Sequence, residues 1–468
     1  MSFDLVTDPE IISGYLTDAS NVQGHAGALV RPRTTAEVCE VVRQCQLYGT
    51  PLTVCAQRTS TTAAPVPFGG WLLSMEHLTR VRSVSQDTAT AEGGVILGEF
   101  QREIEERGRF FPPDPTSRHE CSLGAAISCN ASGARSFRYG PMRRWVESLE
   151  VVLPNGELST VARGEPYPAD WPKVLWRQPP VKTAAGYCGD SHLDAFIGQE
   201  GTLGIIVAAT VRLVDPPRGI FGLLVYFPHR RAAVAFMEQA RHSARENPNG
   251  ALSPRCLEYL DQYCLNLARH SVGDVPDGAR AALFCEQELE SIGIDEHLAA
   301  WWEALSESEA LVDDTVVATD SPGLAKLHEF RHAIPVGINE QIVDNQVSKV
   351  GTDLAVPDSA LNEMMTAYEK SPLPHVLFGH IGDNHLHLNL LPEDGAQFAQ
   401  AREYCTKLVH RALALGGTVS GEHGIGKLKK MYLAKMAGEE TIQQFRALKA
   451  HLDPKCVLGR GVMFDAEL

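Results

Sequence analysis

The sequence predicts an α+β protein with a β-rich N-terminal part and a later part built on an antiparallel sheet. Residues 28–55 show a strand, a helix and a second strand in succession. Asn155 and Gly156 separate two runs of alternating apolar residues, which predicts a β-hairpin. Beyond residues 216–219, which read Pro-Pro-Arg-Gly, strands alternate with long helical segments. This alternation favours an α+β domain with an antiparallel sheet.

The first helix is predicted over residues 34–49, where apolar side chains recur at helical spacing. Thr34 or Thr35 can cap its N-terminus, and Gly49 can end it. Residues 51–56 follow as a short buried strand. The next elements are strands within residues 69–75, 78–85 and 88–97, a helix that ends at Gly108, the hairpin of residues 146–162, and a glycine turn with a buried strand within residues 195–214.

Composition narrows the class of protein. Of the 468 residues, 44% are hydrophobic and 21% charged, which is ordinary for a globular protein. The net charge of −16 argues against nucleic acid and against a polybasic membrane anchor. We expect no transmembrane helix and no signal peptide. The 11 scattered cysteines include no CxxC pair, so we expect a reducing cytoplasm. A symmetric homodimer is the expected assembly, because such dimers are common.

A histidine-rich stretch, GHIGDNHLHLNLL at residues 379–391, is the first candidate site. Its polar and apolar residues alternate, which predicts a strand with His385, His387 and Asn389 on one face. The glycines before the strand permit a turn that brings His380 beside His387.

A second polar cluster, Glu422 and His423, lies among glycines downstream. Adjacent side chains usually point apart, so one can bind a metal while the other faces a substrate. Two imidazoles and one carboxylate form a divalent-metal site with open positions, and this set suits Zn²⁺, Mn²⁺ or Fe²⁺. A polar loop with surface histidines is the alternative, and residue types alone leave both readings open.

Four long motifs resemble one known family. FGHIGDNHLHLN and SGEHGIGKLKKMYL resemble the C-terminal signature of FAD-linked D-2-hydroxyacid dehydrogenases, which act on D-lactate, D-2-hydroxyglutarate or glycolate. RFFPPDPTSRHECSLGAAISCNASGARSFRYGPMRRWVESLEVVLPNGE and FIGQEGTLGIIVAATVRL resemble the FAD domain of the vanillyl-alcohol-oxidase superfamily. The resemblance covers nearly the whole chain.

The resemblance implies a division into domains. Residues 1–217 would form a PCMH-type FAD-binding domain with two subdomains, about 1–85 and 86–217. Residues 218–425 would form an α+β cap domain, which binds substrate, carries the metal site and contains the antiparallel sheet. Residues 426–468 would pack back on the FAD domain.

Matching positions also imply three metal ligands, one catalytic base and three substrate contacts. The ligands are His380, His387 and Glu422, the base is His423, and the substrate contacts are Arg331, Lys349 and Asn389. The family usually has asparagine where His385 stands, so the resemblance places His385 outside the metal set. Residue type alone would make Arg331 a surface ion pair on a helix.

The largest departure from the family lies in the loop expected to meet the FAD pyrophosphate. No GxGxxG follows a predicted strand, so a Rossmann NAD site is not indicated. The family has a glycine-rich loop where this chain reads CAQRTSTTAAPVP, and hydroxyls and Arg58 would replace the glycine amides. The residues expected at FAD are Gln57, Arg58, Thr59, Ser60, Thr61, Pro113, Asp114, Gly124, Asn130, Ser132, Gly133, Glu200, Gly204 and Ile205.

The implied activity is oxidation of a D-2-hydroxyacid to the 2-oxoacid by hydride transfer to flavin N5. A divalent metal would polarise the hydroxyl while His423 takes its proton. A quinone, a flavoprotein or a cytochrome would accept the electrons. Two alternatives stay open. One is an ether-lipid synthase of the alkyl-dihydroxyacetonephosphate type on the same scaffold. The other is a flavin-free scaffold subunit of a redox complex, which the altered loop favours.

Overall fold

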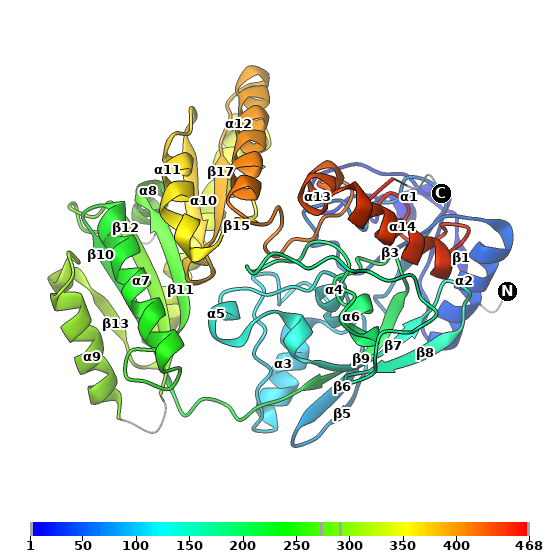
Figure 1. Cartoon of the computed structure of the whole chain (residues 1–468), viewed down its shortest axis with the longest axis horizontal. Helices are drawn as coiled ribbons and strands as arrows, with labels where there is room; N and C mark the ends of the chain where they lie inside the picture. The colour runs from blue at the N-terminus through cyan, green and yellow to red at the C-terminus, as the bar shows by residue number, and fades with distance from the viewer. Residues whose placement is uncertain (1–2, 272–274, 290–292, 466–468) are drawn as a thin grey trace.

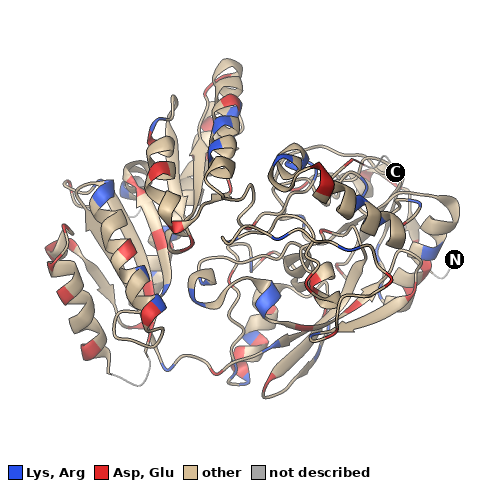
Figure 2. Ribbon diagram, in the orientation of Figure 1, with Lys and Arg blue, Asp and Glu red and all other residues tan. Residues whose placement is uncertain are grey.

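Three β-sheets organise the chain in a computed structural model that describes residues 3–271, 275–289 and 293–465. The two sheets of the N-terminal part lie together, and the third lies apart from them with its own helices (Figure 1). The antiparallel sheet predicted beyond residues 216–219 is confirmed. Acidic residues predominate on helix α9 (Ile294–Ser306), and both signs of charge occur on α12 (Gly395–Ala414) (Figure 2).

The first sheet has four strands in the order β1-β2-β4-β3. Strands β2 and β3 run parallel to β4, and helix α2 (Thr35–Tyr48) connects β2 to β3. The predicted caps of α2 are confirmed, because Thr34 accepts a hydrogen bond from the Glu37 amide and Gly49 has φ +67°. The strands are β1 (Leu5–Val6), β2 (Ala28–Val30), β3 (Leu52–Cys55) and β4 (Trp71–Ser74), and α1 spans Pro9–Ser13.

The second sheet has five antiparallel strands in the order β5-β6-β9-β7-β8. The predicted hairpin is confirmed as β7 and β8, and Gly156 has φ +79° in the turn between them. The strands are β5 (Val81–Val84), β6 (Thr88–Glu92), β7 (Val146–Val152), β8 (Leu158–Ala162) and β9 (Ile205–Arg212). The helices beside them are α3 (Leu97–Glu106), α4 (Leu123–Ser128), α5 (Ser136–Tyr139) and α6 (His192–Phe196).

The third sheet has eight strands in the order β13-β10-β12-β11-β16-β17-β14, with β15 paired to β17. Helix α7 packs on β10, β11 and β12, and α8 packs on β11 and β16. The strands are β10 (Ile220–Phe227), β11 (Pro254–Asp261), β12 (Ala281–Glu288), β13 (Val316–Ala318), β14 (Val350–Gly351), β15 (Leu354–Ala355), β16 (His375–Gly379) and β17 (His385–Leu390). The further helices are α7 (Arg230–Glu246), α8 (Gln262–Ser271), α10 (Ser321–Asn345) and α11 (Leu361–Glu369).

The chain returns to the N-terminal part after the third sheet. Helices α13 (Lys430–Ala437) and α14 (Glu439–Leu452) lie near α1 and α2 in Figure 1. The Leu52 amide donates to the Val457 carbonyl at 2.8 Å, and the buried Lys449 ammonium donates to the Thr202 and Leu458 carbonyls. The return therefore places the loop that carries Glu422 and His423 between the N-terminal part and the third sheet. None of the helices in the described ranges has both the length and the apolar character needed to cross a membrane.

Candidate active site

The turn between β16 and β17 folds two histidines toward each other. Gly379 has φ +132°, a conformation that L side chains rarely adopt, and a Cβ atom there would lie 3.0 Å from His387 Cδ2. Asn384 closes the turn in the left-handed region with φ +52°. The rings of His380 and His387 consequently lie 5.8 Å apart between centroids, although the residues occupy opposite ends of the turn.

The Glu422 carboxylate joins these imidazoles from the loop before α13. His387 Nε2 lies 3.2 Å from Glu422 Oε1, and His380 Nε2 lies 3.3 Å from Glu422 Oε2. The other side of the carboxylate meets the N-terminal part, because Oε2 lies 3.1 Å from the Lys182 ammonium and accepts from the Ser132 hydroxyl at 3.3 Å. Burial would raise the pKa of Glu422, but Lys182 and His380 hold it well below its usual value.

Each imidazole has an acceptor on its outer nitrogen. His380 Nδ1 lies 2.5 Å from Glu258 Oε1, and His387 Nδ1 lies 3.4 Å from the Thr352 carbonyl. Burial lowers the pKa of His380, but the Glu258 carboxylate overrides this effect and raises it to about 9. An acceptor on one ring nitrogen directs the lone pair of the other nitrogen inward, as in carboxylate–histidine–metal arrangements. Sequence reasoning missed Glu258, because it lies 122 residues before His380, in a strand that shows no motif of the site.

His423 lies on the open side of the cluster. Its ring stacks on that of His387 at 5.3 Å between centroids and an interplanar angle of 20°, and its side chain is 35% exposed. Partial burial lowers the pKa of His423 to about 4, although the Asp353 carboxylate acts in the opposite direction. The ring is therefore neutral near pH 7, and it can accept a proton from a group that approaches from the open side.

Asp353, which sequence reasoning also missed, organises the loop behind Glu422 and His423. It accepts from the backbone amides of both residues, at 3.2 and 3.1 Å. It also accepts from the Lys429 ammonium at 2.7 Å and from the Ser420 hydroxyl at 2.7 Å. Asp353 stands in the VSKVGTDLAVP segment, in which the family resemblance assigns a role only to Lys349. It holds the loop so that both side chains reach the cluster, where His423 Nε2 lies 3.7 Å from Glu422 Oε1.

The three expected substrate contacts lie at different distances from the cluster. Arg331, on α10, donates two hydrogen bonds to Glu258 Oε2 and is thus one residue removed from His380. Asn389 is buried on β17, two positions after His387. Lys349 is exposed just before β14, which pairs with β17 beside Asn389. The structure brings Arg331 and Asn389 to the cluster and leaves Lys349 at its edge.

The altered loop keeps backbone conformations that favour glycine. Arg58 and Ala63 both have φ +59°, and Gln57 Oε1 is buried and has no hydrogen-bond partner in the part of the chain that the structure describes. The Arg58 guanidinium lies over the Tyr15 ring, 4.7 Å from its centroid. The Lys427 amide donates to the Thr62 carbonyl, so the loop contacts the segment that follows His423. An unpartnered buried carbonyl and a cradle of hydroxyls fit a ligand that donates and accepts hydrogen bonds, such as FAD.

Several other residues expected at FAD contact one another or neighbouring backbone. Gly133 packs so tightly on Asp114 that a Cβ atom would lie 1.8 Å from the Asp114 carbonyl oxygen. Asn130 accepts from the Arg143 amide and donates to the Thr183 carbonyl. Glu200 accepts from the Ile425 and Gly426 amides, at 2.8 and 2.7 Å.

The remaining residues expected at FAD lie in close backbone packing, at the start of a strand or in the altered loop. Gly124 packs on Gly93, Gly204 packs on Val151, and Ile205 begins β9. Pro113 accepts from the Gln101 side chain, and Thr59, Ser60 and Thr61 lie in the altered loop.

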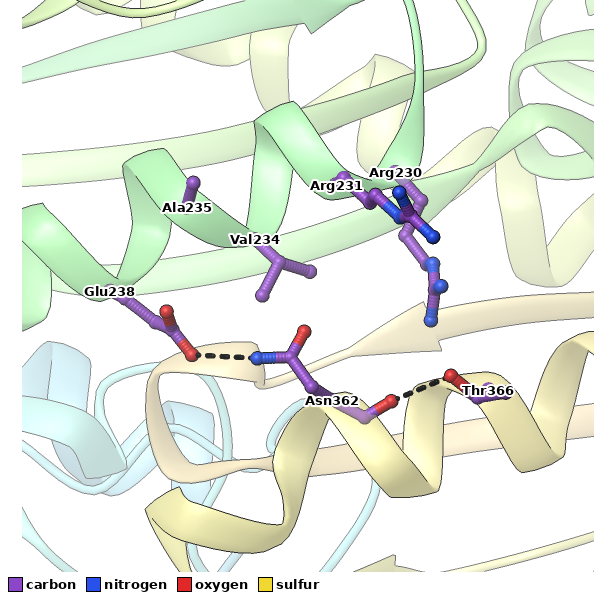
Figure 3. Close-up of a pocket in the computed structure, with 7 residues that line it drawn as sticks. All are labelled: Arg230, Arg231, Val234, Ala235, Glu238, Asn362 and Thr366. Carbon is purple, nitrogen blue, oxygen red and sulfur yellow. Dashed lines mark hydrogen bonds between the residues drawn. The ribbon is translucent and has the colours of Figure 1, made fainter.

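The ligating atoms fit a divalent metal. One ligand atom from each of His380, His385, His387 and Glu422 lies within 4.8 Å of the others. Imidazole nitrogen and carboxylate oxygen are the donors that Zn²⁺, Mn²⁺ and Fe²⁺ bind. A cavity of about 370 Å³ lies elsewhere, between α7 and α11 (Figure 3). There Asn362 donates to Glu238, and no residue that lines the cavity belongs to the predicted site.

Comparisons with known proteins agree with the layout. Residues 26–162 match the family model described as "FAD binding domain", and residues 223–463 match "FAD linked oxidases, C-terminal domain". The chain is 28% identical to the glycolate oxidase subunit GlcD of Bacillus subtilis over 96% of this chain and 92% of that protein. It is 30% identical to a D-2-hydroxyglutarate dehydrogenase of Xanthomonas citri pv. viticola, over 94% of this chain and 89% of the relative.

A third relative and a solved structure extend the likeness. A D-lactate dehydrogenase of Anaerostipes hadrus is 28% identical over 97% of this chain and 93% of its own. The solved structure of an alkyldihydroxyacetonephosphate synthase superposes with a TM-score of 0.71 and 17% identity, over 97% of this chain and 81% of that chain. At that identity the superposition shows the fold alone.

Proposed function

The chain belongs to the FAD-linked oxidases, and from this membership and the geometry of the cluster we propose that it oxidises a D-2-hydroxyacid with the help of a divalent metal. The curated relatives act on 2-hydroxyacids according to their names, and D-lactate, D-2-hydroxyglutarate and glycolate are the candidate substrates. The site would lie where the proposed FAD domain, residues 1–217, meets the proposed cap domain, residues 218–425. Bound FAD supplies the hydride acceptor.

One observation carries the metal part of the proposal. His380 and His387 turn their inner nitrogens toward Glu422, while their outer nitrogens meet Glu258 and a backbone carbonyl. A divalent cation held there supplies Lewis-acid polarisation of the substrate hydroxyl. The buried acceptors fix both rings, so the donor set needs little reorganisation to bind a cation.

The remaining roles follow from position. His423 is neutral and open to solvent beside the cluster, so it takes the proton of the substrate hydroxyl. The Arg331 guanidinium, anchored by Glu258, binds the substrate carboxylate and orients the C2–H bond. Asn389 lines the same face of β17 as His387 and donates to the bound acid. Together these groups align one hydrogen of the substrate toward the flavin.

Anaerobic stopped-flow spectroscopy tests this proposal. The purified holoprotein is mixed with D-lactate, D-2-hydroxyglutarate or glycolate, with L-lactate and L-2-hydroxyglutarate as controls, and the flavin absorbance is followed. Bleaching by a D-acid or by glycolate, and none by the L-acids, supports the proposal. Flavin that no 2-hydroxyacid bleaches would favour the ether-lipid synthase alternative, which shares the fold. A protein that neither contains nor takes up FAD would favour the scaffold alternative.

A further inference from the structure

The His385 imidazole has one nitrogen that no protein atom satisfies. Its Nε2 donates to Asp353 Oδ1 at 2.7 Å. Its Nδ1 is buried and has no hydrogen-bond partner among the described residues, and the whole side chain has 0% exposure. An unpartnered buried acceptor costs folding free energy, and such groups often mark a site for an ion or another ligand.

The ring of His385 belongs to the metal cluster by distance. The His385 ring centroid lies 4.6 Å from that of His387 and 5.4 Å from that of His380. Glu422 completes a group of four with these histidines, and one ligand atom from each residue lies within 4.8 Å of the others. The His385 ring packs closely on Gly421, where an added Cβ atom would lie 2.4 Å from His385 Nε2. This close packing restricts rotation of the ring.

The three imidazoles share one arrangement. Each has an acceptor on one nitrogen: Glu258 for His380, the Thr352 carbonyl for His387, and Asp353 for His385. The opposite nitrogens of His380 and His387 face the Glu422 carboxylate, and that of His385 has no hydrogen-bond partner among the described residues. An outer acceptor of this kind fixes the tautomer and raises the basicity of a metal-binding imidazole.

We infer that His385 Nδ1 is a fourth protein ligand of the metal, beside His380, His387 and Glu422. The inference rests on the metal site of the proposed function, and it replaces the expectation from family resemblance that His385 lies outside the metal set. Asparagine at this position could not present a nitrogen lone pair. The chain therefore differs from the family pattern in the number of its imidazole ligands.

A competing group, Asp353 with His387 and His423, is also close enough to hold an ion. Both oxygens of Asp353 already accept hydrogen bonds, from His385 and the Glu422 amide on Oδ1 and from the His423 amide, Ser420 and Lys429 on Oδ2. Few lone pairs remain for a cation there. In the four-residue group the inner nitrogens of His380 and His387 face Glu422, a member of the same group, and His385 Nδ1 has no hydrogen-bond partner among the described residues.

Four protein ligands change which metals can also bind substrate. Zn²⁺ is saturated by four ligands in tetrahedral sites, whereas six-coordinate Mn²⁺ or Fe²⁺ retains two positions. A 2-hydroxyacid needs two positions, one for its carboxylate and one for its hydroxyl. Mn²⁺ or Fe²⁺ should therefore bind a chelating acid better than Zn²⁺ does in this protein.

X-ray absorption spectroscopy of the zinc-loaded holoprotein tests the ligand count. We expect a fit with three imidazoles for the wild type and two for His385→Asn, and a zinc affinity at least about tenfold lower in the variant. His385→Gln is a second variant, and His242→Asn, at an exposed site on α7, is the control. Circular dichroism and FAD content verify that each variant folds.

Unchanged imidazole count and zinc affinity in both His385 variants would overturn the inference and leave the metal of the proposed function in place. A wild-type protein that binds no divalent metal would overturn the inference and the metal part together. Calorimetry with oxalate, a chelating acid that is not a 2-hydroxyacid, gives a separate readout. Equal oxalate affinity for the manganese-loaded and zinc-loaded wild type would contradict four protein ligands, and a preference for manganese that His385→Asn removes would support them.

Discussion

The Lys182 ammonium lies 3.1 Å from Oε2 of Glu422 and joins the N-terminal part of the chain to the candidate metal cluster. Lys182 is nearly buried, with a side-chain exposure of 5%. Its charge offsets that of Glu422, and its contact leaves Oε1 directed at the imidazoles. The orientation of Glu422, in the loop before α13, therefore depends on a residue that precedes it by 240 positions.

Replacing His423 by alanine should slow flavin reduction by substrate by about 10²- to 10⁴-fold, because the general base is lost. FAD content should not change. Stopped-flow reduction of the variant, with His242→Ala as the control, measures the effect. Reduction at the wild-type rate would remove His423 from the mechanism.

The pH dependence of flavin reduction should follow from the low pKa of the same residue. His423 must be neutral to accept a proton, and its pKa is lowered to about 4. The rate should therefore fall only as the pH drops through about 4 and should show no loss from this group between pH 6 and 8. A half-maximal rate near pH 6.5 would mean that the histidine that takes the proton has an ordinary pKa.

Removal of the metal should slow flavin reduction without releasing FAD. Dialysis against EDTA, followed by metal analysis and stopped-flow reduction, gives the comparison. Addition of Mn²⁺, Fe²⁺ or Zn²⁺ should restore the rate to different extents, because the ions differ in coordination number. Full activity in protein shown to be free of metal would assign the histidines another role.

Arg331→Lys should reduce kcat/KM on the order of 10²-fold, because lysine keeps the charge but cannot present two parallel N–H groups. The charge that balances the buried Glu258 remains, so the free energy of unfolding should change less than the activity. Steady-state kinetics and urea unfolding measure the two quantities. Arg231→Lys on the exposed side of α7 is the matched control.

Ala63→Gly should relieve backbone strain in the altered loop. Ala63 is fully buried at φ +59°, a left-handed conformation that costs an L residue roughly 1–2 kcal/mol. Glycine relieves this strain, but its greater conformational entropy in the unfolded chain offsets about 0.5–1 kcal/mol of the stabilisation. We expect a free energy of unfolding that rises by up to about 1 kcal/mol and an unchanged or tighter FAD affinity. A clearly destabilised variant would show that the methyl group is needed for packing.

Lys449→Met should destabilise the protein by about 3–5 kcal/mol, because it leaves the buried Asp453 without its ion pair. It also removes the hydrogen bond to Thr202, which ties α14 to the N-terminal part, and the hydrogen bond to Leu458 in the following segment. Urea unfolding measures the change, and Lys435→Met, on the exposed side of α13, is the control. A change below about 1 kcal/mol would show that the apolar contacts of residues 457–464 hold the segment without Lys449.

Local signals in the sequence predicted much of the fold. The caps of α2 and the Asn155-Gly156 hairpin need only neighbouring residues, so they can be read directly. The length of α10 could not be predicted in this way, because Pro335 lies inside the helix, where proline usually marks an end.

The residues of the candidate site likewise differ in whether neighbouring residues in the sequence reveal them. The histidine stretch and the Glu422–His423 pair stand out because each is compact in the sequence. Glu258, Asp353 and Lys182 do not, since each is a single charged residue that reaches the cluster through tertiary structure. No periodicity distinguishes such residues from solvated charges on the surface.

The path of the chain also has a mechanical consequence. The third sheet is an insertion, which leaves the N-terminal part once, through residues 213–219, and is followed by a segment that anchors in the first sheet through Val457 and Leu458. A protease that nicks the chain at residues 216–219 would not set the inserted lobe free, because the lobe stays covalently joined to the C-terminal segment, which packs on the N-terminal part. Nicked protein should migrate as an intact particle until a denaturant parts its two fragments.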